Sequence, residues 1–314
     1  MPKITLSAVS RTQGNNRALK EGRISLPDFE LVFEEVDPLV RAFRNMVRDG
    51  TYDVSEMALT TYICARAHGA KLTGLPIFLV RDFHHKSMCL SAKAGLKGPK
   101  DLDGRRVGVN RGYTVTTGVW ARSILAEEHG VDLSRVTWAR SGDEHVAGYL
   151  RPTNVEELGG EGSLEEQLQH GTLAAAVGLP AKGEGLLPMI PDAFDAGLRA
   201  FRERGFYPIN HLVVIRDDVL AANPGLARQV FDAFAASKKL YLDDLRAGRI
   251  TEPTPIDKVH QAVMEHQQDP LPYGLAPNAA VLETLMAQAT AQGIIDNPIG
   301  LEDLFAPELL DVVA

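Results

Sequence analysis

Cysteine is scarce in this chain, whose 314 residues include only Cys64 and Cys89. Each cysteine lies in an apolar run, and free cysteine behaves as a small hydrophobic residue, so we expect two buried thiols. A disulfide or a metal-binding pair is the less favoured interpretation, and no spacing of Cys and His residues resembles a zinc site. The sequence therefore shows no metal-binding motif, and it leaves open a divalent ion held by Asp, Glu and His residues from distant segments.

Long apolar runs and blocks of basic residues are also missing. No apolar stretch approaches the roughly 20 residues that a helix needs to span a bilayer, so we expect no membrane contact. The net charge is −8, and the sequence contains no block of Lys and Arg residues. Both features argue against a nucleic-acid-binding surface. Residues 1–9 have the pattern of a β-strand and lack the apolar core of a secretory signal, so we expect a cytoplasmic protein.

Strand and helix signals alternate along most of the chain. A strand expected over 52–57 precedes a helix over 58–68, and a strand over 106–109 precedes a helix over 116–129. This alternation predicts α/β layers with parallel strands.

The length of the chain allows two modest lobes, each with its own core. From Pro224 onward the pattern is mostly helical and has too few strands for a third domain, so we expect this tail to pack on the first lobe. We therefore predict a two-lobed fold in which lobe II, residues 85–218, is inserted into lobe I, residues 1–84 and 219–314. A ligand cleft is expected between the lobes.

The strongest functional signal runs from Arg81 to Trp120. The segment Arg81-Asp-Phe-His-His-Lys86 places two imidazoles between an arginine and a lysine. The segment 110–117 is a glycine-containing turn that leads into a helix rich in threonine. Because a helix start carries unpaired N–H groups and about half a positive charge, it attracts carboxylates. Together the two segments predict a pocket for a small anion.

Two arginines and two threonines are candidates for holding that anion. Arg81 follows a predicted strand, at the edge where ligands gather in α/β sheets, although a surface ion pair with Asp82 is the alternative. Arg111 lies in the next strand-to-helix turn. Thr114 and Thr116 either contact the anion or only cap the helix.

Histidines supply the candidate proton donors. His84 and His85 would point in opposite directions in an extended segment, so one of them should face the cleft, and the sequence leaves open which. His211, with Asn210, precedes a strand and either touches ligand or pairs with a backbone carbonyl. The remaining helical histidines lie at exposed-looking positions and have no expected role: His129, His170, His260 and His266.

Ser55 and Glu56 follow a predicted strand in a turn that typically lines the cleft of a two-lobed fold. Glu56 could accept a proton from a ring hydroxyl. Alternatively, it is an acidic residue in the first turn of a helix, where the helix dipole favours it.

Several segments resemble the 4,5-dihydroxyphthalate decarboxylase family in sequence and in order along nearly the whole chain. They are Asp101–Val109, Val119–Arg122, Tyr207–Arg216, Asp269–Asn278, Gln292–Ile294 and Leu304–Glu308. The resemblance implies the type 2 periplasmic-binding-protein fold, an α/β architecture with a ligand cleft between two lobes.

The chain departs from the family pattern at two places. The family often has Arg-x-Phe-Arg-His where this chain has Arg81, Phe83 and His85 in matching positions but His84 in place of an arginine. The family's Pro-Glu-Tyr-Gln turn corresponds to residues 110–113, with a one-residue insertion; Tyr113 matches, but an acidic residue has become Arg111. Exchanging a carboxylate for a guanidinium predicts a different ligand.

The resemblance implies a cofactor-independent decarboxylase of a hydroxylated aromatic carboxylate that protonates the ring carbon and releases CO2. In that mechanism Arg81 and Arg111 hold the acid. His85 protonates carbon, because its ordinary pKa of about 6.5 lets it carry a proton near neutrality. Glu56 or His211 serves as the base. No organic cofactor is required, and we find no nucleotide-binding glycine motif.

Two other functions remain open from the sequence. The same fold commonly serves as a solute-binding or sensor protein for a small organic anion, without catalysis. A cofactor-free enzyme of another type, such as an isomerase, is the third interpretation. Whether the chain forms a homo-oligomer is also left open.

Overall fold

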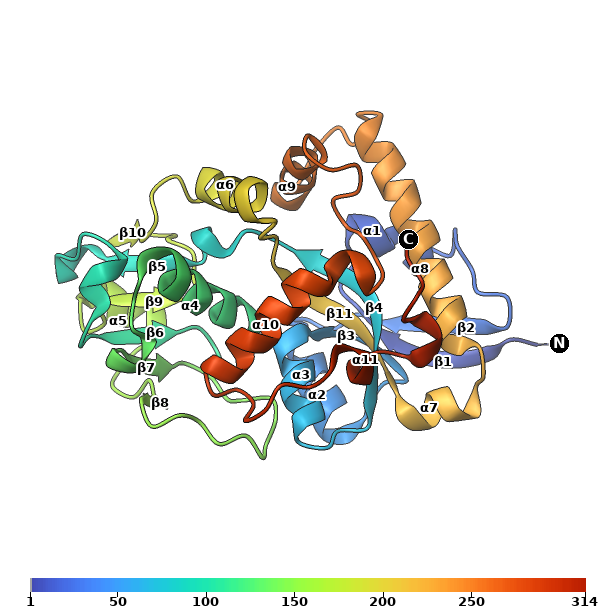
Figure 1. Ribbon diagram of the computed structural model, residues 1–314, viewed down its shortest axis with the longest axis horizontal. Coiled ribbons are helices and arrows are strands. Elements are labelled where there is room, and N and C mark those ends of the chain that lie inside the picture. The colour runs from blue at the N-terminus through green and yellow to red at the C-terminus, as the bar shows by residue number, and fades with distance from the viewer. Residues whose placement is uncertain (1) are drawn as a thin grey trace. The chain divides into compact units, whose positions relative to one another are not determined.

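The computed structural model describes residues 2–314 and divides the chain into two compact units. Unit 1 consists of Met1–Asp82, Ile209–Glu283 and Ile299–Ala314, and unit 2 of Phe83–Pro208 and Thr284–Pro298. Each unit contains one β-sheet with helices packed on it (Figure 1).

The sheet of unit 1 has five strands in the order β2-β1-β3-β11-β4. β1 runs parallel to β2 and β3, whereas β11 runs antiparallel to both β3 and β4. The strands are β1 (Ile4–Val9), β2 (Phe29–Glu34), β3 (Val54–Ala58), β4 (Leu72–Arg81) and β11 (Ile209–Arg216).

The core of unit 1 lies between this sheet and α8 (Leu226–Arg246). Val230, Phe231 and Phe234 of α8 share a buried cluster with Leu75 and Ile77 of β4. α2 (Val40–Asp49) and α3 (Leu59–Ala67) contact β3, while α1 (Gly14–Lys20) packs on α8. The remaining helices are α7 (Asp217–Ala222), α9 (Pro255–Met264), α10 (Ala279–Ala291, which spans the boundary at residue 283), α11 (Leu301–Leu304), and the short 3-10 turns Ala276–Asn278 and Pro307–Leu309.

The sheet of unit 2 has six strands in the order β10-β5-β9-β6-β7-β8. β6, β7, β8 and β9 are parallel, whereas β5 runs antiparallel to β9 and to β10. The strands are β5 (Met88–Ser91), β6 (Arg106–Val109), β7 (Thr137–Arg140), β8 (Val155–Glu157), β9 (Ala175–Val177) and β10 (Leu186–Pro188). The helices are α4 (Thr116–His129), α5 (Leu164–His170) and α6 (Ala193–Arg204), with 3-10 turns at His84–Lys86, Ala92–Ala94, Pro99–Leu102 and Leu133–Arg135.

The predicted α/β class with two lobes is confirmed, and so are the two buried free thiols of Cys64 and Cys89.

The lobe boundaries differ from the prediction. Residues 209–218 were expected in the inserted lobe, but β11 pairs with β3 and β4 and so completes the sheet of unit 1. Thr284–Pro298, expected in lobe I, belongs to unit 2. The strands are also not all parallel. The sequence did not reveal this, because an antiparallel strand has the same local residue pattern as a parallel one.

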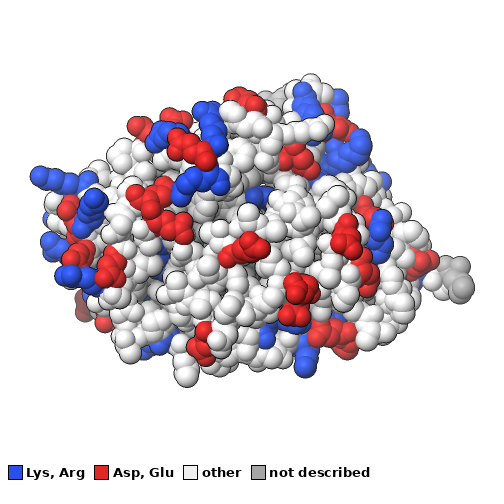
Figure 2. Space-filling model, in the orientation of Figure 1, with Lys and Arg blue, Asp and Glu red and all other residues white. Residues whose placement is uncertain are grey.

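No helix in residues 2–314 combines the length and the apolar character that crossing a membrane requires. On the face shown in Figure 2, basic and acidic side chains are interspersed, without a large block of one sign.

Candidate functional site

One edge of the sheet in unit 1 gathers several of the predicted site residues. β1, β3 and β4 end at this edge, and antiparallel β11 begins there, because His211 is in register with Ala58 of β3 and Val80 of β4. The fold therefore brings Glu56 and His211 together, although 155 residues separate them in the chain.

Glu56 and His211 are in close contact at this edge. Nδ1 of His211 lies 2.6 Å from Oε1 of Glu56. Oε2 of Glu56 accepts hydrogen bonds from the Ser10 hydroxyl at 2.8 Å and from the Arg11 backbone N–H at 3.0 Å. The Glu56 side chain is fully buried, whereas that of His211 is 18% exposed. Both carboxylate oxygens are thus satisfied, and the imidazole reaches the surface.

The surroundings of Glu56 keep its carboxyl ionised. Burial by itself would raise the pKa of Glu56, but hydrogen bonds from His211 and Ser10 and the nearby charges of His211 and Arg11 lower the pKa below its ordinary value. A carboxylate on Nδ1 holds the proton on that nitrogen. Phe43 packs edge-on against the imidazole, with ring centres 5.1 Å apart, and restricts its orientation.

Ser10, Arg11 and Asn16 were missed in the sequence. Asn16 is fully buried and donates from Nδ2 to the Ser10 hydroxyl at 2.8 Å and to the Arg11 carbonyl at 2.9 Å. These bonds fix the segment that follows β1 against Glu56. The one signal in the sequence is the polar pair Asn15-Asn16 a few residues after the first predicted strand, but its partner at residue 56 lies far along the chain.

Ser55, Arg81 and Asn210 are also buried in unit 1. The Ser55 hydroxyl donates to the Glu56 carbonyl at 2.7 Å, which ties it to the backbone of β3. The Arg81 guanidinium donates to Oδ1 of Asn278 at 2.7 Å, within the segment Asp269–Asn278 that matched the family pattern. Arg81 is 5% exposed and so is not the surface residue that the alternative interpretation required.

The histidine pair of unit 2 has a different environment from the one expected. His84 and His85 lie in a 3-10 turn, not in an extended segment, and both imidazoles are buried, so the argument that they point in opposite directions does not apply. Nε2 of His85 lies 3.0 Å from Glu128, which also pairs with Arg204. Burial by itself would raise the pKa of Glu128, but these two partners lower it.

The structure does not bring His85 close to the predicted anion turn in unit 2. Glu128 lies in the last turn of α4, whereas Tyr113 and Thr114 directly precede the helix. A helix rises 1.5 Å per residue, so the 14 residues of α4 separate its two ends by about 20 Å. His85 and the residues at the start of α4 therefore belong to different environments.

The anion-binding turn before α4 is occupied by the protein's own Glu144. The backbone N–H groups of Tyr113 and Thr114 donate to its carboxylate at 2.6 and 3.1 Å, and the Thr114 hydroxyl donates at 2.7 Å. A side chain at Gly112 would lie 2.6 Å from the same carboxylate, so only glycine leaves room for it. The turn does bind a carboxylate, as predicted, but that carboxylate is the side chain of Glu144 and not a ligand.

The other predicted residues of this turn serve its conformation. Arg111 is exposed and adopts φ of 70°, and its N–H donates to the Ser141 hydroxyl at 2.9 Å. The Tyr113 ring is buried against the guanidinium of Arg122, whose carbon lies 3.8 Å from the centre of the ring. Arg122 also donates a hydrogen bond to the Tyr113 carbonyl at 2.7 Å. Thr116 is buried, and no side chain caps α4, whose N-cap is Val115.

Residues 2–314 contain no group of three or more His, Cys, Asp and Glu side chains placed to hold a metal ion. The edge of the sheet in unit 1 holds a carboxylate–imidazole pair, Glu56 and His211, which is suited to acid–base chemistry.

Comparison with known proteins gives two curated relatives of the same name. No protein-family model matches the sequence. A 4,5-dihydroxyphthalate decarboxylase from Comamonas testosteroni is 29% identical over an alignment of 334 positions, which covers 99% of this chain and 99% of that protein. A 4,5-dihydroxyphthalate decarboxylase from Pseudomonas putida is 30% identical over 208 residues, which span 63% of this chain and 75% of that protein.

Solved structures are similar to this chain over almost its full length. The alkanesulfonate-binding protein SsuA from Xanthomonas axonopodis pv. citri has a TM-score of 0.54 at 16% identity, covering 97% of this chain and 96% of that chain. The desulfurization enzyme DSZB has a TM-score of 0.58 at 17% identity, covering 98% of each chain. Similarity at such low identity shows the fold alone, and the fold is the periplasmic-binding-protein-like one that the sequence predicted.

Proposed function

Because the chain belongs to the 4,5-dihydroxyphthalate decarboxylase family, we propose that it decarboxylates a hydroxylated aromatic carboxylate without a cofactor, with His211 and Glu56 as its acid–base pair. Family membership makes the chain a carboxy-lyase. The observation that carries the finer proposal is the 2.6 Å contact between His211 and the buried carboxylate of Glu56.

The reaction needs a proton at the ring carbon before the carboxylate leaves. Direct loss of CO2 would leave an unstable aryl carbanion. Protonation of the carbon that bears the carboxylate avoids it, because an ortho or para hydroxyl supplies electron density to the ring. The bond to the carboxylate then breaks, its electron pair restores the aromatic ring, and CO2 departs. One proton is consumed in each turnover.

His211 is suited to deliver that proton. Imidazole is the side chain that most often transfers protons in enzymes, and the Glu56 carboxylate holds the orientation of this ring through Nδ1. Within residues 2–314, the hydrogen bond of the His211 ring is made through Nδ1, which leaves Nε2 to donate its proton to substrate. Water then reprotonates the imidazole at its exposed edge.

We assign the acid role to His211 in preference to His85 on the basis of their partners. His85 is 1% exposed and is bound to Glu128 through Nε2. Arg81, at the same sheet edge as His211, supplies a buried positive charge for orienting the acid. The predicted contribution of Arg111 to substrate binding stays a prediction.

The proposal is tested by CO2 release from 4,5-dihydroxyphthalate and from related hydroxylated benzoates. We expect His211→Gln to lower kcat by about 10²- to 10⁴-fold, the range for loss of a general acid, with an unchanged fold by circular dichroism. His85→Gln, with correct folding, should retain most of kcat. The exposed His170→Gln is the matched control.

Two outcomes would reject the proposal. Full turnover by His211→Gln would remove His211 as the acid. A ligand-induced thermal shift without CO2 from any compound of the panel would instead favour a solute-binding protein, the function suggested by the structural similarity to SsuA.

A further inference from the structure

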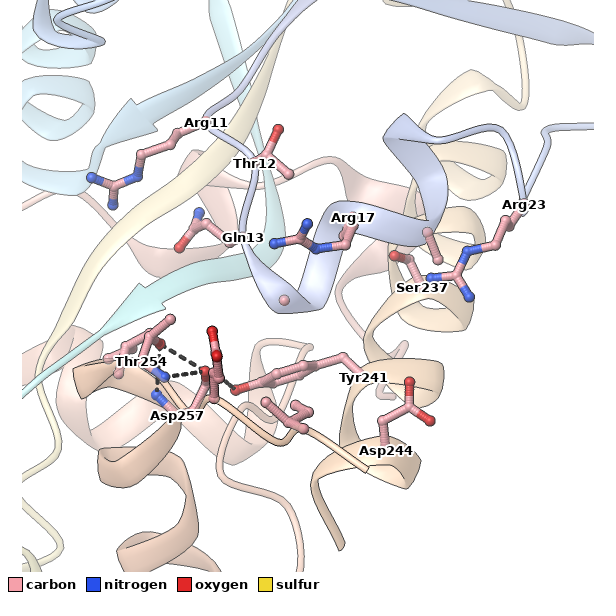
Figure 3. Close-up of a pocket in the computed structure, with 15 residues that line it drawn as sticks. Arg11, Thr12, Gln13, Arg17, Arg23, Ser237, Tyr241, Asp244, Thr254 and Asp257 are labelled. Carbon is pink, nitrogen blue, oxygen red and sulfur yellow. Dashed lines mark hydrogen bonds between the residues drawn. The ribbon is translucent and has the colours of Figure 1, made fainter. Parts of the chain in front are cut away.

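A cavity lies in unit 1 between the start of α1, the end of α8 and the start of α9 (Figure 3). Its volume is about 450 Å³, within the range of roughly 300–1,000 Å³ that is usual for small-molecule sites. Neither Glu56 nor His211 lines it. Arg11 connects the two places, because it lines the cavity and its backbone N–H donates to Glu56.

Hydrogen-bond donors lie on one side of this cavity. Arg17 projects there from α1, and Gln13 from the position that directly precedes the helix (Figure 3). The Arg17 guanidinium has no hydrogen bond or ion pair to the residues described at 2–314. The side-chain nitrogen of Gln13 is buried and has no partner. A guanidinium beside an amide N–H provides a site for a carboxylate.

An acceptor lies on the opposite side of the cavity. Oδ1 of the buried Asp257 accepts a hydrogen bond from the Tyr241 hydroxyl at 2.6 Å. Oδ2 of Asp257 accepts from the backbone N–H and the hydroxyl of Thr254, at 2.8 and 2.7 Å. An ionised carboxylate has about four acceptor positions, so Asp257 can still accept a hydrogen bond from a ligand hydroxyl.

The charges around the cavity select against multiply charged anions. Three arginines line it, and so do three acidic residues, so the lining is neutral overall: Arg11, Arg17, Arg23, Asp244, Glu252 and Asp257. A phosphate or a dicarboxylate would meet the acidic side with excess negative charge. A ligand with one carboxylate at one end and a hydroxyl at the other matches both sides.

We propose that this cavity binds a hydroxylated aromatic monocarboxylate, with its carboxylate at Arg17 and Gln13 and a ring hydroxyl donating to Asp257. The choice of an aromatic ligand rests on the proposed function, because decarboxylation of a hydroxylated aromatic dicarboxylate yields a monocarboxylate of this class. The cavity is then a binding site separate from the Glu56–His211 pair, and Arg11 belongs to both places.

The test is calorimetric titration of the full-length protein with 3,4-dihydroxybenzoate and, separately, with benzoate. Wild-type protein should show an Arg17-dependent binding event that is about tenfold weaker for benzoate, which lacks the hydroxyls. Arg17→Gln should weaken this event tenfold or more. Arg41→Gln removes the same charge from an exposed site outside the cavity and is the matched control.

The proposal is overturned if Arg17→Gln binds 3,4-dihydroxybenzoate as the wild type does, or if Arg41→Gln weakens binding equally. Asp257→Asn gives a further test in correctly folded protein, because it should reduce the preference for the hydroxylated ligand. The binding test and the assay of CO2 release fail independently. Turnover without Arg17-dependent binding would reject this cavity alone, and binding without turnover would reject the decarboxylase.

Discussion

At the scale of single residues, the role of each histidine depends on what surrounds it. His211 pairs with Glu56 and His85 with Glu128. His260 was expected at an exposed helix position, but it is 4% exposed and its Nδ1 lies 2.7 Å from the Tyr241 hydroxyl. Burial lowers the pKa of His260 from 6.5 to about 4. A local residue pattern does not distinguish these cases, because each partner comes from another part of the chain.

The buried His260 predicts a loss of stability in mild acid. Between pH 6.5 and about 4 the unfolded chain binds a proton at His260 that the folded protein excludes, so the free energy of unfolding falls as pH falls. From pH 7.5 to 5.0 the loss from this group should be about 2 kcal/mol. Urea unfolding of His260→Gln should show a smaller loss than the wild type. An equal loss in both proteins would contradict the assignment, and His170→Gln is the exposed control.

At the scale of elements, the turn before α4 shows how a local preference is satisfied from within the protein. The sequence 110–117 predicted a turn that attracts a carboxylate. Glu144 supplies that carboxylate from the loop after the neighbouring strand β7. The partner was not predictable, since Glu144 has no distinctive local pattern and becomes a neighbour only when β6 and β7 pair.

Removing Glu144 should leave the N–H groups of Tyr113 and Thr114 without their acceptor. We expect Glu144→Ala to lower the free energy of unfolding by about 1–3 kcal/mol, the usual cost of unsatisfied buried donors. Acetate should then raise the Tm of the variant by binding in place of the lost carboxylate, relative to chloride at the same ionic strength. The wild type and the exposed-site variant Glu184→Ala should not respond. Equal effects of acetate and chloride on Glu144→Ala would argue against an anion site.

At the scale of the whole molecule, unit 1 is assembled from three separate stretches of chain. The last of these returns to the sheet at Gly74, which forms a parallel bridge with Phe305 and accepts a hydrogen bond from the Ala306 N–H at 3.0 Å. A side chain at Gly74 would lie 3.0 Å from the Leu304 carbonyl and 3.0 Å from the Tyr62 ring. The C-terminal segment therefore packs against a strand more than 200 residues earlier, and glycine permits this close approach.

Gly74→Ala should weaken the attachment of the C-terminal segment. The added methyl group meets backbone and ring atoms at once, so we expect a loss of about 1–3 kcal/mol in the free energy of unfolding, as for other overpacked sites. Urea unfolding followed by fluorescence measures it. Gly98→Ala is the control, because its added carbon would meet no atom within 4 Å and its φ of 173° suits any residue. Equal urea midpoints for Gly74→Ala and Gly98→Ala would contradict this prediction, because they would show that the C-terminal segment accommodates the added methyl group.

The sequence by itself determined the α/β class, most of the strands and helices, the two buried thiols and the family. Residue periodicity reports which face of an element is buried, and family segments keep their order along the chain. Only the tertiary structure decided the direction of β11, the pairing of Glu56 with His211 and the filling of the α4 turn by Glu144. Each of these joins residues that are distant in the chain. Their proximity depends on how the strands assemble into sheets, which no local pattern of residues encodes.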